Sequence, residues 1–392
     1  MQKRTIRDID VAGKAVLLRV DYNVQVEGGR VQDDLRLRES LPTIDALRKA
    51  GARVVIVSHR GRPHGAADEM LRNEPVAQHL SKLLGIHVAV ARECIGPEAK
   101  AVVEALKPGE VVLLENLRFH VEEEENDEEF ARQLAALADV YVNDAFGTAH
   151  RAHASIVGVP KFLPSVAGLL LEKEVSILAR LGTNPERPLG LVLGGAKIAD
   201  KIAILNHLCD VTDVICVGGG VGNTFLKARG IDVADSLVDD DGIADAKRVL
   251  SRANGQLKVV LPSDAVAAFG GAAGAQIRTV PVTYVPSGWR ILDLGPATLD
   301  AFHNALAPMR TIVWNGPVGL FEHPPFDIGS LAVARMLAEI GATTIVGGGE
   351  TAAAVQRAGV AERMAHVSTG GGASLAMLQG KVLPGVEALD DA

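Results

Sequence analysis

The sequence has few cysteines, and it contains no long apolar run. The three cysteines, Cys94, Cys209 and Cys216, form no CxxC pair, which excludes a disulfide framework and a zinc site of the usual spacing. No stretch approaches the ~18 apolar residues of a membrane span, and the charged start MQKRTIRDID has no apolar core of a signal peptide. We therefore expect a reducing compartment, the cytoplasm, and no membrane partner.

Aromatic residues and positive charge are also scarce. Aromatic residues make up only 4% of the chain, and 40 basic residues against 48 acidic ones give a net charge of −8. A nucleic-acid-binding protein needs a basic footprint or aromatic stacking platforms, so we expect a small-molecule partner. The 392 residues, 48% of them hydrophobic and 22% charged, are typical of a globular protein with two domains.

Short runs rich in valine, isoleucine and leucine alternate with amphipathic helical stretches along the chain. Continuous apolar runs separated by helices are typical of buried parallel strands in βαβ units. The pattern predicts an α/β fold of two doubly wound domains with mainly parallel sheets. The first group of runs covers residues 15–20, 54–58, 87–90, 111–114 and 139–142, and the second covers 189–193, 214–217, 257–261, 311–314, 343–346 and 364–368.

A long helical pattern at residues 167–181 separates the two groups of runs, and the breaker-rich GTNPERP (182–188) follows it. We expect residues 1–166 to form the first domain, residues 167–181 to form a connecting helix with a hinge, and residues 182–377 to form the second domain. No short repeat recurs at a fixed period, which excludes solenoids and propellers.

The acidic run EEEENDEE (122–129) is the only low-complexity stretch. Acidic residues are tolerated near the positive N-terminal end of a helix, so we expect an exposed loop that enters a helix. A metal-binding role for these carboxylates is the alternative.

Polar and basic side chains follow the strands of the first half, and ligands bind beyond the carboxyl ends of the strands in open α/β sheets. Arginine suits carboxylate and phosphate oxygens, so the pattern predicts a site for a small, multiply anionic, hydroxylated molecule. Any one arginine taken alone could be a solvated surface residue. The side chains are those of Asp21, Asn23, Arg36, Arg38, His59, Arg60, Arg62, Arg118, His120, Asn143, Asp144, His150, Arg151 and His153.

A metal site among the histidines is disfavoured, because His150 and His153 stand three apart without a nearby carboxylate pair.

Glycine clusters follow the strands of the second half: GGAK (194–197), GGGVGN (218–223), GGGET (347–351) and STGGGAS (368–374). Glycine allows a positive φ and a close backbone approach, and helix N-termini attract anions. One glycine pair could be only a tight turn, but four clusters predict a phosphate site to which backbone N–H groups converge. We expect Lys197 and Lys201 on one face of the helix after GGAK. There they would bind a polyphosphate, and the alternative is that they are surface lysines without a ligand.

The usual nucleotide signatures are absent. No G-x-x-x-x-G-K-[ST] motif occurs, and GGGVGN has Asn223 where the G-x-G-x-x-G fingerprint needs glycine or alanine. No G-x-S-x-G motif supplies an activated nucleophile either. A site for a small anion in one domain and a phosphate site in the other indicate direct phosphoryl transfer, which needs positioning and charge more than acids or bases.

Ten segments of the chain resemble the phosphoglycerate kinase family and run in family order. They are RVDYNV (19–24), DDLRLR (33–38), SHRGRP (58–63), LLENLRF (113–119), VNDAFGTAHRAHAS (142–155), LGGAKIADK (193–201), GGGVGNTFL (218–226), IVWNGPVGLFE (312–322), GGGET (347–351) and STGGGASL (368–375). The resemblance implies two Rossmann-like domains, a monomer, and Mg²⁺-dependent phosphoryl transfer between 1,3-bisphosphoglycerate and ADP, giving 3-phosphoglycerate and ATP after hinge closure. It also implies that residues 378–392 pack back on the first domain.

The resemblance implies roles for individual residues. Arg36 and Lys197 would flank the transferred phosphoryl group, and Glu322 would contact the ribose. Charge on the moving group would be stabilised by the helix start at Gly370, Gly371 and Gly372. The substrate would be held by Asp21, Asn23, Arg36, His59, Arg62, Arg118 and Arg151, and the nucleotide by Gly195, Lys197, Lys201, Gly219, Asn315, Pro317, Glu322, Gly348, Gly349, Glu350 and Thr351.

Four residues, at three places in the chain, depart from the family pattern. Gln25 replaces a proline, Val221-Gly222 replaces Met-Ala or Ile-Ala, and Glu350 replaces the aspartate that meets magnesium. Glu350 is therefore a metal ligand or only a helix-capping acid. Two alternative functions are considered. A kinase for another carboxylic acid, such as acetate or aspartate, would not require so many arginines. A non-catalytic nucleotide-binding scaffold would be expected to lose some of the charged residues of phosphoryl transfer.

Overall fold

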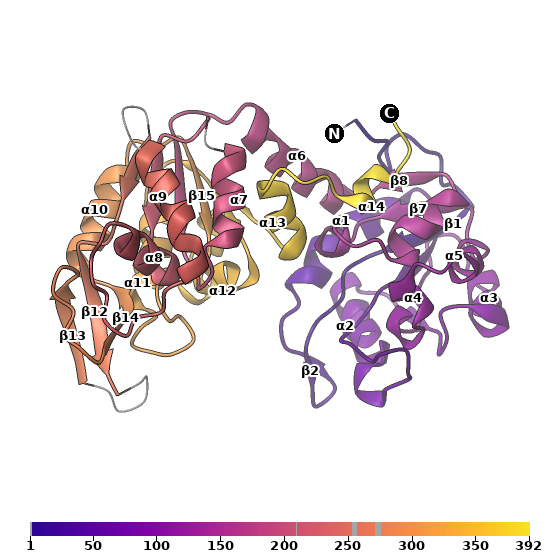
Figure 1. The fold of residues 1–392 in the computed structure, drawn as a ribbon. Helices are drawn as coiled ribbons and strands as arrows, with labels where there is room; N and C mark the ends of the chain where they lie inside the picture. The colour runs from indigo at the N-terminus through magenta and orange to yellow at the C-terminus, as the bar shows by residue number, and fades with distance from the viewer. Residues whose placement is uncertain (1, 209, 253–256, 271–275) are drawn as a thin grey trace. The chain divides into compact units, whose positions relative to one another are not determined.

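The computed structural model describes residues 2–208, 210–252, 257–270 and 276–392, so Cys209 lies outside the described residues. The chain forms two compact units (Figure 1). Unit 1 comprises Met1–Ile177 and Val382–Ala392, and unit 2 comprises Leu178–Lys381. None of the described helices is long and apolar enough to cross a membrane.

Six parallel strands form the sheet of unit 1 in the order β5-β6-β4-β1-β7-β8. The prediction of a parallel sheet from the first five apolar runs is confirmed, and β8 is an additional edge strand. The strands are β1 (Ala15–Arg19), β4 (Arg53–Val57), β5 (Val88–Val90), β6 (Val111–Leu113), β7 (Val140–Asn143) and β8 (Ser165–Ala167).

Amphipathic helices accompany this sheet. In α1 (Leu35–Lys49), Leu37, Ile44 and Leu47 recur at helical spacing and are buried in the same core as the strand residues. The other helices of unit 1 are α2 (Glu74–Leu84), α3 (Gly96–Glu104), α4 (Glu122–Glu125), α5 (Glu128–Ala135) and α14 (Pro384–Glu387). A short hairpin joins β2 (Val26–Glu27) to β3 (Arg30–Val31), and single turns cover Glu69–Leu71, Leu117–Phe119, Phe146–Thr148, Ala154–Gly158 and Val159–Lys161.

The acidic run at residues 122–129 was expected to be exposed, and this expectation is wrong for one of its residues, Glu123. Asp127 caps α5 by accepting a hydrogen bond from Phe130 N at 2.8 Å, as a helix start requires. Glu123, however, is fully buried, and its carboxylate accepts hydrogen bonds from the N–H and the hydroxyl of Ser155 at 2.9 and 2.6 Å. A buried ion needs such partners, and the sequence does not reveal that they exist.

The last residues of the chain pack on unit 1. Asp390 N donates to Ser165 O at 2.9 Å, and Arg4 N donates to Asp390 O at 2.9 Å. Farther back in the chain, Asn143 Nδ2 donates to Gly385 O at 3.0 Å. These bonds tie the segment that follows Lys381 to β7 and β8.

Helix α6 (Leu169–Thr183) starts two residues later than the sequence pattern indicates. The cause is a cap supplied from elsewhere in the chain: the Asp144 carboxylate, at the end of β7, accepts hydrogen bonds from Leu170 N at 2.8 Å and Leu171 N at 3.1 Å. Gly168 leaves room for this carboxylate, because a Cβ there would overlap it. The boundary between the two units falls within α6, after Ile177.

Unit 2 contains a second sheet of six parallel strands, in the order β11-β10-β9-β15-β16-β17. All six predicted runs are strands of this sheet. Strand order reverses between β9 and β15, and ligands of such sheets bind at this switch point. The strands are β9 (Leu189–Leu193), β10 (Val214–Val217), β11 (Lys258–Val260), β15 (Thr311–Asn315), β16 (Thr343–Gly347) and β17 (His366–Val367).

A three-stranded antiparallel sheet in unit 2 was not predicted. It consists of β12 (Asp264–Phe269), β13 (Gln276–Pro281) and β14 (Trp289–Leu294), in the order β13-β12-β14. In Figure 1 this sheet lies to one side of the parallel strands of its unit. The helices of unit 2 are α7 (Ala199–Leu208), α8 (Gly219–Ala228), α9 (Ile243–Arg252), α10 (Pro296–Leu306), α11 (Ile328–Glu339), α12 (Gly349–Arg357) and α13 (Gly372–Leu378), with single turns at Asp240–Gly242 and Ala361–Arg363.

Candidate active site

Neighbouring strands bring the predicted substrate residues of unit 1 together. Strand β1 lies between β4 and β7, so their carboxyl ends meet at one edge. Asp21, after β1, forms an ion pair with Arg36 of α1. Gly147, after β7, lies against this pair, and a Cβ there would overlap the Asp21 carboxylate. Burial alone would raise the pKa of Asp21, but the positive charge of Arg36, with that of Arg19, holds this pKa below its usual range, so the carboxylate stays ionised.

The backbone of Gly61 links two more predicted residues, Asn23 and Arg118. Gly61 N donates to Asn23 Oδ1 at 2.9 Å, and the buried Arg118 donates from Nη1 to Gly61 O at 2.7 Å. Arg118 also lies 3.0 Å from the Glu124 carboxylate. His59 is buried, and its burial holds the pKa well below the usual range, so the ring is neutral at pH 7.

The other arginines that follow the strands of unit 1, which form its basic rim, are Arg38, Arg60, Arg62 and Arg151, and they divide into two kinds. Among the described residues, none forms a hydrogen bond or ion pair with the side chains of Arg62 and Arg151. Arg38 instead forms two hydrogen bonds with Asp34, at 2.7 and 2.8 Å, and Arg60 donates to the backbone carbonyls of residues 70 and 72. The charges of Arg38 and Arg60 are therefore used within the protein.

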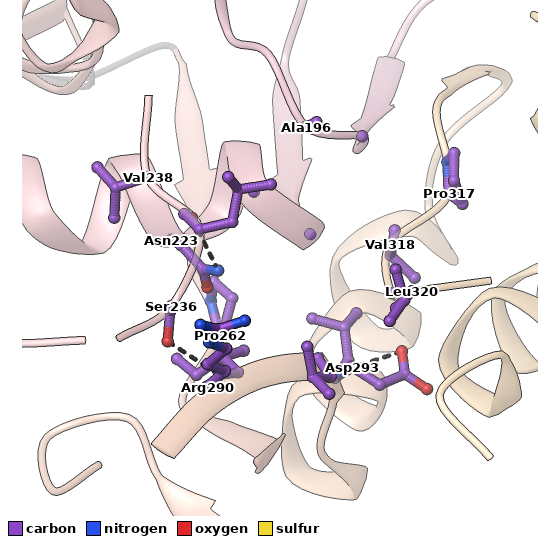
Figure 2. A pocket seen from close by; sticks show the side chains of 18 of the residues that line it. Ala196, Asn223, Ser236, Val238, Pro262, Arg290, Asp293, Pro317, Val318 and Leu320 are labelled. Carbon is purple, nitrogen blue, oxygen red and sulfur yellow. Dashed lines mark hydrogen bonds between the residues drawn. The ribbon is translucent and has the colours of Figure 1, made fainter. Parts of the chain in front are cut away.

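A pocket of about 780 Å³ lies in unit 2 beyond the ends of β9, β10 and β15. Figure 2 shows part of its wall, with Asn223, Ser236 and Arg290 on one side and Asp293, Val318 and Leu320 on another. Five predicted nucleotide residues line the pocket, namely Gly195, Gly219, Pro317, Glu322 and Glu350.

The glycines beside the pocket allow a close approach of two backbone segments. Gly195 N donates to Pro317 O and Gly219 N donates to Val318 O, both at 2.8 Å. A Cβ at Gly194 would overlap Pro317 O. The N–H groups of Gly195 and Gly219 are thus bonded inside the protein. The expected convergence of these two N–H groups on a phosphate is wrong in this conformation.

Two polar side chains connect β15 with the helices around the pocket. Asn315 Oδ1 accepts a hydrogen bond from Lys201 Nζ, and its Nδ2 donates to Gly347 O at 2.9 Å. Thr351 Oγ1 accepts a hydrogen bond from Gly316 N at 2.8 Å. Burial lowers the pKa of Lys201, while the charges of Asp200 and Glu350 oppose that shift. These bonds place the GGGET segment beside the loop that follows β15.

Lys197 is not on the helix where the spacing placed it. Helix α7 begins at Ala199, so Lys197 lies in the preceding loop and is exposed, whereas Lys201 is in the first helical turn. The helix does not reach back to Lys197: Ile198 N donates to the Asp239 carboxylate at 3.0 Å, and Gly195 has a φ of +91°, outside the helical range. The two lysines therefore do not share a helical face.

The other glycine residues of the prediction begin two helices. Gly348, with a φ of +97°, caps α12, in which Gly349 is the first residue and Glu350 is exposed in the first turn. Gly370 and Gly371 precede α13, which begins at Gly372, and Gly371 has a φ of +47°. Helix α12 follows β16 and helix α13 follows β17, so both helices start near the carboxyl ends of these neighbouring strands.

Sequence reasoning missed one wall of the pocket. This wall comes from the segment after α8, from Pro262 and from β14, and only Pro262 follows a parallel strand, the edge strand β11. The short charged motifs DSLVD (235–239) and WRILD (289–293) are the only signals of it. The missed residues are Asp235, Ser236, Leu237, Val238, Pro262, Arg290, Ile291, Leu292, Asp293 and Leu294.

Asp293 is a buried carboxyl group in this wall. It accepts hydrogen bonds from Gly329 N at 2.7 Å and Leu294 N at 2.9 Å. Burial raises the pKa of Asp293 to about 7, and the nearby charge of Asp327 adds to the shift. Gly319, in the loop that carries Pro317 and Glu322, lies against the carboxyl group, and a Cβ there would overlap it.

We expect Asp293 to make folding stability fall between about pH 4 and pH 7. The unfolded chain ionises this carboxyl near pH 4, whereas the folded chain retains the proton until about pH 7, so stability is present at low pH and is lost as the pH rises. Relative to Asp293→Asn, the wild type should lose roughly 3 kcal/mol of unfolding free energy between pH 5 and pH 8.

Tryptophan fluorescence during denaturant unfolding measures this change, because Trp289 and Trp314 both lie in unit 2. Asp300→Asn, at an exposed position of α10, is the matched control. A difference between wild type and Asp293→Asn that does not change with pH would contradict the prediction.

Comparisons with known proteins agree with this arrangement. The family model for phosphoglycerate kinase matches residues 6–381. The phosphoglycerate kinases of Pelotomaculum thermopropionicum and Moorella thermoacetica are 55% and 52% identical over 392 residues, with all of both chains covered. A solved structure of phosphoglycerate kinase from Coxiella burnetii has a TM-score of 0.88 at 38% identity, covering 98% of each chain. The match over the whole length shows that this chain belongs to the phosphoglycerate kinase family.

Proposed function

We propose that the chain catalyses reversible phosphoryl transfer between 1,3-bisphosphoglycerate and ADP, which gives 3-phosphoglycerate and ATP. The observation that carries this function is the full-length family match. It is supported by the two separate half-sites, a basic cluster at the strand ends of unit 1 and a pocket at the switch point of unit 2. We also propose that the enzyme works as a cytoplasmic monomer.

Unit 1 supplies the groups that hold the phosphoglycerate. The guanidinium groups of Arg62 and Arg151, which none of the described residues binds, are available to phosphate or carboxylate oxygens, and Asn23 and His59 suit the hydroxyl group. Asp21 keeps the Arg36 guanidinium in place through their ion pair. Arg118 is already bonded to Gly61 O and Glu124, so it contributes charge from beneath the site.

Unit 2 supplies the groups that hold the nucleotide. Pro317 and Glu322 lie in the pocket wall, where they would contact the base and the ribose, and Lys201 and Thr351 lie beside the phosphate end. Because each substrate is assigned to its own unit, transfer requires hinge closure around both. The phosphoryl group then passes directly between substrates, and Lys197 and Arg36 stabilise its charge.

Magnesium fits the donor set at the phosphate end of this pocket. Mg²⁺ prefers oxygen ligands and usually takes one or two carboxylates together with phosphate oxygens and waters. Glu350 offers an exposed carboxylate in the first turn of α12, and its charge acts on Lys201, where it opposes the lowering of the pKa of Lys201 by burial. A bound Mg²⁺ would neutralise phosphate charge, and Glu350 is the protein residue that would hold it.

A coupled spectrophotometric assay with 3-phosphoglycerate and ATP tests the proposed function. Turnover with these substrates is expected, and it should be lost when acetate or aspartate replaces 3-phosphoglycerate. Turnover with acetate or aspartate instead would indicate another carboxylate kinase. Nucleotide binding without any turnover would indicate a binding protein.

We expect Glu350→Gln to raise the Mg²⁺ concentration needed for half-maximal activity, while Glu350→Asp remains active. The neutral amide is a weaker ligand for a hard cation, whereas aspartate keeps the charge. Titration of activity with Mg²⁺ at saturating ATP measures the effect, with Glu339→Gln, at an exposed position of α11, as the control. An unchanged Mg²⁺ dependence in Glu350→Gln would leave Glu350 only its role at the helix start, where an acid suits the dipole.

A further inference from the structure

The loop of residues 316–322, which follows β15, forms one wall of the pocket in unit 2. The residues of this loop that line the pocket are Pro317, Val318, Gly319, Leu320 and Glu322. The proposed function assigns the base to Pro317 and the ribose to Glu322, and Val318 stands between them in the chain. The conformation of this loop therefore decides how the pocket meets the nucleoside part of ADP or ATP.

Hydrogen bonds from the backbone hold the loop against other segments of unit 2. Gly195 N and Gly219 N each donate to a carbonyl oxygen of the loop, as described above. On another side, Leu320 N donates to Leu292 O of β14 at 2.7 Å. These three bonds join backbone groups, so they remain when a side chain outside the loop is shortened.

Ser330 bonds to the centre of the loop through its side chain. Its Oγ accepts a hydrogen bond from Val318 N at 3.0 Å, and both residues are fully buried. Ser330 lies in the first turn of α11 and is not one of the residues that line the pocket. It therefore acts on the pocket wall from behind, without a place of its own in the nucleotide site.

The start of α11 is itself bonded to β14. Gly329, the residue before Ser330, donates from its N–H to Asp293 Oδ2 at 2.7 Å. A Cβ at Gly329 or at Gly319 would overlap the Asp293 carboxyl group, so the helix start and the loop both pack closely against it. Figure 2 shows Asp293 on the same part of the wall as Val318. The hydroxyl of Ser330 is thus presented to the loop from a helix start that has its own anchor.

We propose that Ser330 is a positioning residue for the nucleotide, because its hydroxyl holds the N–H of Val318 and with it the wall that carries Pro317. This inference rests on the proposed function, since it concerns the same nucleotide site. Without the hydroxyl, Val318 N is a buried donor that has lost its acceptor, and the loop must shift or admit water to satisfy it.

A shift of this wall should change nucleotide binding and leave the transfer step unchanged. The wall is assigned to the base and the ribose, which do not react, so its contacts are the same in the ground state and in the transition state. Loss of such uniform binding raises KM and leaves kcat at saturation unchanged.

Steady-state kinetics of the full chain tests the proposal. In Ser330→Ala, the KM for ADP and for ATP should rise about fivefold to tenfold, while kcat and the KM for 3-phosphoglycerate stay within about twofold of the wild type. Ser330→Thr keeps the hydroxyl and should retain a KM for ADP near that of the wild type. Calorimetric titration with ADP checks that the change lies in binding.

Thr311→Val is the matched control, because it also removes a buried hydroxyl of unit 2. Thr311 Oγ1 donates to Glu186 O at 2.7 Å at the start of β15, the end of the strand opposite to the loop. Its KM for ADP should equal that of the wild type.

An unchanged KM for ADP in Ser330→Ala would overturn the proposal. An equal rise in Thr311→Val would overturn it too, because the effect would then come from a general loss of stability. An equal rise in Ser330→Thr would assign the effect to packing and not to the hydroxyl, with the same consequence. Failure of the proposed function gives a different result, namely no turnover of ADP by the wild type.

Discussion

Replacing Lys197 or Arg36 by alanine lowers kcat by two or more powers of ten. Removal of one preorganised group that stabilises charge in a transition state costs about a hundredfold to a thousandfold in kcat. Lys197 is exposed, and among the described residues it has no ion pair that would neutralise its charge. Arg36 is held by the Asp21 carboxylate, which fixes the guanidinium before substrate arrives. The sequence has no G-x-S-x-G motif that would supply a nucleophile for covalent catalysis, so the full effect should appear in either variant.

Rapid kinetics under saturating substrates measures kcat for both variants. Lys227→Ala, at an exposed position of α8, and Arg38→Ala, on the same helix as Arg36, are the matched controls, and both should stay near wild-type kcat. Arg38 is paired with Asp34. Its replacement therefore tests whether loss of any arginine of α1 lowers kcat, or only loss of Arg36. Near-normal kcat in Lys197→Ala or Arg36→Ala would remove that residue from the transfer step.

The parallel strands could be predicted because each is a continuous apolar run between helices. The antiparallel sheet could not be predicted, for a reason visible in its residues. Strand β13, QIRTVP, is exposed along most of its length, and β12, DAVAAF, is rich in alanine, which favours no strand. Strand β8 has only three residues, Ser165–Ala167. Pairing with neighbours, and not local propensity, decides these segments.

Candidate site residues could be predicted where they directly follow parallel strands. Asp21, Asn23 and His59 were found this way, and the fold brings them together because β1 and β4 are neighbours. The residues of β14 in the pocket wall could not be predicted, because no sequence rule places an antiparallel strand beside the switch point of a parallel sheet. The position of Lys197 in a loop could not be predicted either, because the adjacent Ile198 N–H binds the carboxylate of Asp239, which is distant in sequence.

A buried charge cluster beneath the basic rim was also invisible in the sequence. Arg19 and Glu123 are both fully buried, with their charged groups 3.9 Å apart. Arg19 donates from Nε to Ser155 Oγ at 2.8 Å and from Nη1 to Val20 O, and its Nη2 lies 3.3 Å from His59 Nδ1. Burial raises the pKa of Glu123, while the charge of Arg19 opposes that shift. Ser155 joins the two ions, because its hydroxyl bonds to both.

We expect Arg19→Met to destabilise the protein by about 3–5 kcal/mol, because it leaves Glu123 as a buried charge without its partner. Glu123→Leu should cost a similar amount, since Arg19 would then lose its only buried counter-ion among the described residues. The double variant should cost much less than the sum, because replacing both ions of a buried pair by apolar groups is often nearly neutral. A double-mutant cycle therefore separates the pair from ordinary loss of packing.

The position of the tryptophans makes this measurement specific to one unit. Both tryptophans lie in unit 2, so fluorescence follows unit 2 alone, whereas circular dichroism follows the helices of both units. Denaturant unfolding of Arg19→Met should shift an early circular dichroism transition while the fluorescence transition stays near its wild-type midpoint. Single variants that each cost less than about 1 kcal/mol, or costs that simply add in the double variant, would show that Arg19 and Glu123 are not energetically coupled.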